Sequence, residues 1–146
     1  MISVAEYLGQ HGAGHESELT DELRGNADVI VEQANALLAE FGEDRGLRSG
    51  WRPKSVNDAT PNAARASKHI SCQAIDIEDN DHRLKEFVLK RNEYGAYPVL
   101  EQFGLYAEFA GATPSWLHVQ FVPPGSGKRV YAPNATWAAR MAAEVA

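Results

Sequence analysis

Two short segments with alternating apolar residues constrain this chain most. In Ala74–Glu78 the two isoleucines point to one face of a predicted strand, and Asp76 points to the other. In Trp116–Phe121 the residues Leu117, Val119 and Phe121 share one face, and His118 lies on the opposite face. Each segment therefore carries a polar side chain that faces away from the core side of its strand.

Those two side chains belong to a set with metal-binding chemistry. His69 lies seven residues before Asp76, and His118 follows some forty residues later. Two imidazoles and one carboxylate are ligands of the kind that catalytic zinc sites use, with a fourth position left for water. The alternative is that the two histidines are hydrogen-bonded core residues of a metal-free protein.

Size and composition narrow the class of protein. A chain of 146 residues, 44% apolar and 23% charged, fits one ordinary globular domain, residues 1–146. No apolar run approaches the ~20 residues of a membrane helix, so we expect no membrane insertion. A net charge of −6 without a Lys/Arg cluster argues against nucleic acid and anionic membranes as partners. An enzyme or a small-ligand protein remains, and we expect a monomer.

The first twenty residues suggest where the protein is made. They have no basic start and no apolar block, so we expect synthesis in the cytoplasm without a signal peptide. Cys72 is the only cysteine, which excludes an intramolecular disulfide. His11 and His15 are separated by two glycines that oppose a helix, which favours a solvated loop over a second metal site.

Periodicity and turn residues predict an α+β fold. We expect an antiparallel sheet with helices packed on one face and the metal on the other. The strands 105–109 and 116–122 should form a hairpin, and 53–66 should be a long polar connection. The other expected elements are helices at 26–41, 81–91, 97–103 and 134–145, and strands at 46–53, 74–78 and 129–131.

A run of motifs between residues 49 and 131 resembles a known family. The motifs are Ser49-Gly-Trp-Arg52-Pro, Ser67-x-His69 with Ala74-x-Asp76, and Trp116-x-His118. They resemble the zinc D-alanyl-D-alanine carboxypeptidases and dipeptidases and the phage L-alanyl-D-glutamate endopeptidases, which share a hedgehog-like fold. The resemblance implies Zn²⁺ held by His69, Asp76 and His118. It also implies that Arg52 binds the substrate or the transition state, and we expect Ser67 and Trp116 to bind the substrate with it.

The chain departs from the family pattern at two positions. Cys72 stands where the family often has glycine, and Ser115 stands where many members have a catalytic acid. We expect Glu108 to supply the general base, because a hairpin turn centred on Thr113 would place it opposite His118. The alternative is that Glu108 is a structural partner of that histidine or a solvated strand residue. The rival carboxylates are Glu78 and Asp58.

Three functions follow from the sequence. The first is a zinc metallopeptidase that cuts an amide bond in the peptidoglycan stem peptide, as a phage-encoded lysin that acts on the cell wall after release or as part of a virion. The second is a non-catalytic hedgehog-like zinc domain that binds peptide or a partner. The third is a metal-free structural virion component. Which stem-peptide bond is cut cannot be deduced, because substrate choice depends on pocket walls.

Overall fold

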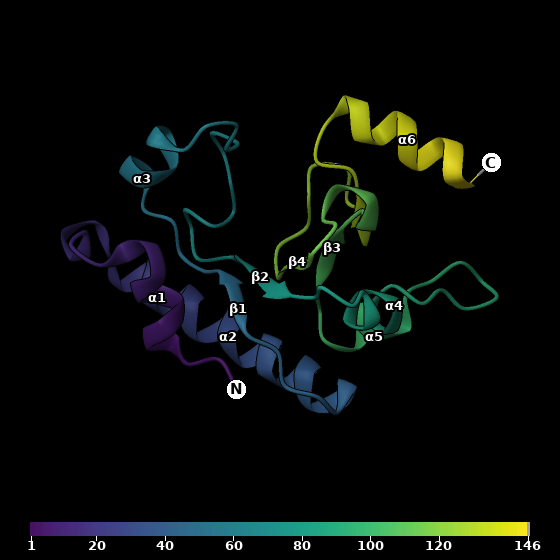
Figure 1. Ribbon diagram of the computed structural model, residues 1–146, viewed down its shortest axis with the longest axis horizontal. Coiled ribbons are helices and arrows are strands. Elements are labelled where there is room, and N and C mark those ends of the chain that lie inside the picture. Colours follow the sequence, from purple (N-terminus) through teal and green to yellow (C-terminus); the bar gives the residue numbers. More distant parts are fainter. Residues whose placement is uncertain (146) are drawn as a thin grey trace. The chain divides into compact units, whose positions relative to one another are not determined.

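The chain contains both helices and short strands, and the last three strands follow one another without an intervening α-helix, which confirms the predicted α+β class (Figure 1). The computed structural model describes residues 1–145, and the chain contacts divide it into two units, Met1–Ile77 and Glu78–Ala146. The five strands follow the order β1-β2-β4-β3-β5 in a mixed sheet. Among the described residues, no helix has the length and apolar character needed to span a membrane.

The first unit contains two longer helices and two paired strands. Its elements are α1 (Val4–Gly12), a 3-10 turn η1 (Glu16–Glu18), α2 (Asp21–Phe41), β1 (Leu47–Ser49), α3 (Lys54–Ala59) and β2 (Ala74–Glu78). β1 and β2 are antiparallel, with Ser49 opposite Asp76. The predicted 53–66 connection contains the short helix α3, a difference from the sequence prediction. Its Ser55 hydroxyl donates to the Glu18 carboxylate, and Asn57 Nδ2 donates to the Ala64 carbonyl.

Helix α1 corrects the start of the loop predicted around His11 and His15. Ser3 caps it, since the Ser3 hydroxyl accepts from Glu6 N while the Glu6 carboxylate accepts from Ser3 N. Gly12 is its last residue, and Gly14, with a φ of 84°, lies beyond it. The two glycines therefore lie at the end of this helix and just beyond it instead of interrupting it, and His11 belongs to its last turn.

Helix α2 was predicted from the apolar period and the glycine at its end. Its apolar stripe is buried, and Gly42 takes the left-handed conformation of a helix C-cap, as predicted. Thr20 caps the start by accepting from Leu23 N, so the helix begins earlier than the stripe alone predicted.

The second unit is organised around the hairpin. Its elements are α4 (Arg83–Val88), α5 (Pro98–Gln102), β3 (Tyr106–Glu108), a 3-10 turn η2 (Ala110–Ala112), β4 (Trp116–Gln120), β5 (Val130–Tyr131) and α6 (Ala135–Val145). β3 and β4 are antiparallel, with Tyr106 opposite Gln120 and Ala107 opposite Val119. The same register places Glu108 opposite His118, as predicted from a turn centred on Thr113.

The predicted antiparallel sheet is wrong in one respect. β5 pairs with β3 in the parallel direction, with Ala107 opposite Val130. After β4 the chain reverses direction and returns along the free edge of β3. Because β3 and β4 are antiparallel, a strand that runs against β4 must run parallel to β3.

Candidate metal centre

The first unit supplies His69 and Asp76. His69 lies in the turn before β2, where its backbone N–H donates to the Ser67 hydroxyl at 3.2 Å. Asp76 lies at the centre of β2, on the face opposite the fully buried isoleucines, as the alternation predicted. Both side chains are largely buried, and His69 Nε2 lies 3.3 Å from Asp76 Oδ2. A proton or a metal ion is needed to make so short a contact favourable.

A backbone carbonyl fixes the tautomer of His69. The Gly50 carbonyl oxygen lies 2.9 Å from His69 Nδ1. A carbonyl can only accept, so Nδ1 must carry a proton. The neutral ring then has its lone pair on Nε2, the atom turned towards Asp76, which is the orientation that a metal-binding histidine requires.

A side-chain network in the second unit orients His118 in the same manner. Gln120 Nε2 donates to the Val122 carbonyl at 2.9 Å, which turns Gln120 Oε1 towards His118 Nε2 at 3.1 Å. Tyr131 Oη also donates to this oxygen, at 2.6 Å. Because Gln120 Oε1 can only accept, His118 Nε2 carries the proton, and Nδ1 is left as the ligand atom.

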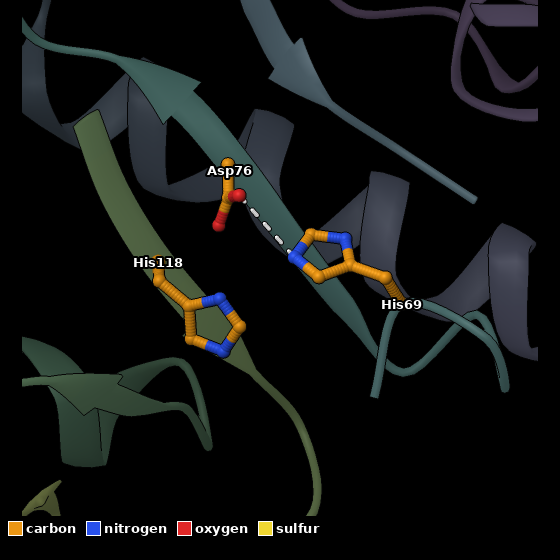
Figure 2. A group of neighbouring side chains, drawn as sticks. All are labelled: His69, Asp76 and His118. Atoms are coloured by element: carbon orange, nitrogen blue, oxygen red, sulfur yellow. Dashed lines mark ion pairs between the residues drawn. The ribbon is translucent and has the colours of Figure 1, made fainter. Parts of the chain in front are cut away.

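Figure 2 shows His69, Asp76 and His118 directed towards one another. Each offers a ligand atom, and these atoms all lie within 4.8 Å of one another. A zinc ion binds such nitrogen and oxygen atoms at ~2.0–2.2 Å. Three buried side chains, two of them with their tautomers already fixed, form a group that could hold a metal ion.

Arg52 lies beside the His69 turn in the first unit. Its backbone N–H donates to the His69 carbonyl at 3.2 Å. Its guanidinium donates to Asn57 Oδ1 at 3.1 Å and to Ser49 Oγ at 3.4 Å, and both of those residues are buried. The head group of this half-buried cation is therefore held in place, unlike that of a freely moving surface arginine.

His11 is a member of this neighbourhood that the sequence analysis missed. Its Nε2 lies 3.3 Å from Ser49 Oγ, the same hydroxyl that Arg52 contacts. Burial, the Arg52 guanidinium and His69 together lower the pKa of His11, so the ring is neutral at neutral pH. The sequence feature that could have indicated this position is the spacing of Tyr7, Gln10 and His11, which places them on one face of α1. The spacing is informative only if the segment is known to be a helix.

The contact that Glu108 makes is with the far side of His118. Glu108 Oε1 lies 4.0 Å from His118 Nε2, the nitrogen that already faces Gln120. This is the contact expected of a partner of the ligand histidine. Of the rival carboxylates, Asp58 pairs with Lys54 on the surface, and Glu78 lies at the end of β2.

The remaining predicted residues occupy positions around the ligands. Trp116 is the half-buried first residue of β4, two positions before His118. The Ser115 carbonyl accepts from Asp79 N at 2.9 Å, and its side chain supplies no acid. Cys72 is fully buried and has a φ of 56°, a conformation that glycine adopts without strain. This explains physically why glycine would suit that position.

Comparison with protein-family models, with curated proteins and with solved structures found no match for this chain.

Proposed function

We propose that this chain is a zinc-dependent peptidase that hydrolyses an amide bond in the peptidoglycan stem peptide, acting as a phage-encoded lysin. The observation that carries the proposal is the buried group of His69, Asp76 and His118. Two histidines and one carboxylate match the ligand sets of catalytic zinc sites, which keep an open position. The motif resemblance supports the peptide substrate.

The site residues have separate roles in the proposed reaction. A bound zinc ion would supply Lewis acidity and a water of lowered pKa. His69 and His118 present unprotonated nitrogens because Gly50 and Gln120 accept from their other nitrogens. Arg52 offers a fixed guanidinium to a carboxylate or to the developing oxyanion.

The identity of the proton acceptor in the proposed reaction depends on the role of Glu108. The hairpin register supports its position opposite His118, whereas its contact with Nε2 supports a role as partner of that ring. This contact, together with Ser115 in place of an acid, favours a second candidate function. In that candidate the zinc domain binds peptide without hydrolysing it.

Metal analysis and mass spectrometry test the two candidates in sequence. The purified protein should contain one zinc ion, and His118→Ala should lose it. His82→Ala should keep it, because His82 is an exposed residue at the start of α4 and not one of the three candidate ligands. Purified wall peptides should then be incubated with the zinc protein and analysed by mass spectrometry. New fragments identify both the activity and the bond, and full zinc occupancy in His118→Ala would refute the ligand assignment.

If the protein contains zinc but leaves the wall peptides intact, the result would support the non-catalytic zinc domain. The absence of zinc from the wild-type protein, after refolding with excess zinc, would refute both candidates and select the metal-free structural protein. This series therefore assigns each outcome to one function.

A further inference from the structure

A cavity of about 560 Å³ lies in the second unit, and none of the three candidate metal ligands lines it. Its walls come from the 91–97 loop, α5, the 128–130 segment and α6. Protein sites that bind small molecules have volumes of about 300–1,000 Å³. The cavity therefore has the size of a small-ligand site, and the side chains around it indicate the chemistry of the ligand.

Three cations line this cavity, namely Arg91, Lys128 and Arg129. Two carboxylates, those of Glu101 and Glu144, line it as well, so the cavity carries an excess of positive charge in a chain whose net charge is −6. Within residues 1–145, no carboxylate forms an ion pair with any of the three cations. Their N–H donors are therefore open to an anion from outside the chain.

The Arg91 guanidinium lies against two residues of the cavity wall. Its Cζ lies 5.6 Å from the centroid of the Tyr97 ring, a cation–π contact that uses none of the five N–H donors. A Cβ on Gly95 would lie 3.0 Å from Arg91 Nη2, so the glycine leaves room for the guanidinium. Arg129 is fixed as well, because its Nη1 donates to the Leu105 carbonyl at 2.9 Å. Both arginines are thus held at the cavity with donors to spare.

Asn92 fixes the loop that carries Arg91 and Tyr97. Asn92 Oδ1 accepts from Tyr94 N and from Ala96 N, both at 3.0 Å. Asn92 N donates in turn to the Ala96 carbonyl at 2.9 Å. This wall is therefore ordered before a ligand binds, which lowers the entropic cost of binding.

Apolar side chains form another part of the wall. Phe109 is 8% exposed, and its ring packs against the Trp137 ring of α6 with 6.1 Å between the centroids. Val130 and Met141 line the same cavity and are half-buried. An inorganic anion alone would leave this apolar wall in contact with water, whereas an aromatic ring joined to the anion would cover it.

We propose that this cavity binds an organic anion in which a carboxylate or a phosphate is joined to an aromatic ring. Arg91 and Lys128 bind the anionic group, and Tyr97 and Phe109 contact the ring. The site shares no residue with the metal centre, so it goes beyond the proposed function and does not depend on it.

Four probes separate the two parts of the ligand: phenyl phosphate, benzoate, inorganic phosphate and benzyl alcohol. Each is titrated into the purified protein, and the backbone amide signals are followed by NMR. The tighter aromatic anion should shift the signals of Gly95 and Val130. It should bind at least about 10-fold more tightly than inorganic phosphate or benzyl alcohol, because each of those lacks one part of the ligand. The comparison of phenyl phosphate with benzoate identifies the anionic group.

A pair of arginine variants tests the role of the guanidinium. Arg91→Gln should weaken binding of the tighter aromatic anion by about 10-fold or more, because it removes a charged donor. The matched control is Arg140→Gln, since Arg140 also stacks on an aromatic ring, 4.7 Å from the Trp137 centroid, but does not line the cavity. Both arginines are exposed, so neither substitution should disturb the fold.

Several results would overturn the site. They are the absence of a saturable shift with either aromatic anion, equal affinity for inorganic phosphate or benzyl alcohol, and an Arg91→Gln variant that binds no more weakly than Arg140→Gln. Shifts centred on the His118 amide would also overturn it, because they would place the anion at the metal centre. None of these results depends on hydrolysis of wall peptides, so failure of the site and failure of the proposed function are distinguishable.

Discussion

Replacing Lys85 with methionine should cost a large part of the free energy of unfolding. Lys85 lies on α4 and is 5% exposed, although lysine is rarely buried without partners. Burial lowers the pKa of Lys85, and the nearby Asp79 carboxylate acts in the opposite direction. The ammonium donates to the carbonyls of Thr113 at 2.5 Å, Pro114 at 3.1 Å and Trp116 at 3.1 Å.

The magnitude follows from these contacts. Each hydrogen bond from a charged donor contributes about 1.5–3 kcal/mol, and the ammonium also lies 3.8 Å from Asp79 Oδ2, which is fully buried. Methionine removes the desolvation cost of the ammonium, but it leaves the Asp79 carboxylate and three carbonyls without this donor. Removing one partner of a buried pair costs about 3–5 kcal/mol, so we expect a loss in that range.

Urea denaturation followed by circular dichroism measures the loss. Lys90→Met is the matched control, because Lys90 is exposed and its replacement should change the free energy of unfolding by less than about 0.5 kcal/mol. A double variant, Lys85→Met with Asp79→Asn, should recover part of the loss, since it removes a buried charge that the ammonium no longer balances. The recovery is partial because the carboxylate also accepts from Leu84 N and Lys85 N, and an amide oxygen replaces only one of these acceptors. A change of less than 1 kcal/mol in Lys85→Met would show that water or neighbouring groups replace the ammonium, and would refute the reasoning.

Three further predictions concern the surroundings of the ligands. Gly50→Ala should lose about 1–3 kcal/mol of stability and weaken zinc binding, because its Cβ would collide with the Tyr7 backbone. Gly9→Ala, with open space around its Cβ, should gain about 0.5–1 kcal/mol, and similar unfolding curves for the two would contradict the packing argument. Burial raises the pKa of Cys72 from 9.0 to about 12, so alkylation by iodoacetamide at pH 8 should be at least ~10²-fold slower than in urea. Equal alkylation rates would place this thiol in solvent. Glu108→Gln should weaken zinc binding about 10-fold by metal titration, whereas unchanged affinity with at least ~10²-fold slower hydrolysis would assign Glu108 as the general base.

The strand patterns allowed a large part of the ligand geometry to be predicted. Alternation around Asp76 and His118 gave the faces of β2 and β4, because a strand has a fixed period of two. The same parity, with a turn centred on Thr113, gave the register that places Glu108 opposite His118. These features are local, so the sequence contains enough information to predict them.

The features that the sequence did not predict depend on contacts between distant segments of the chain. The place of His11 follows from α1 packing on β1 through Gly50, and neither segment reveals the other. Burial of Lys85 follows from three carbonyls that lie about thirty residues away in the chain. The parallel pairing of β5 depends on the path of the chain after β4, which turn residues alone do not determine.

The two candidate ligand histidines differ in how mutation can change the group that orients them. The acceptor for His69 is the backbone carbonyl of Gly50, which is present whatever residue the codon specifies. The acceptor for His118 is the Gln120 side chain, which a single nucleotide change can convert to glutamate or histidine. A single mutation at Gln120 could therefore change the basicity of His118, and with it the affinity for a metal. A mutation can change the acceptor of His69 only by moving the main chain.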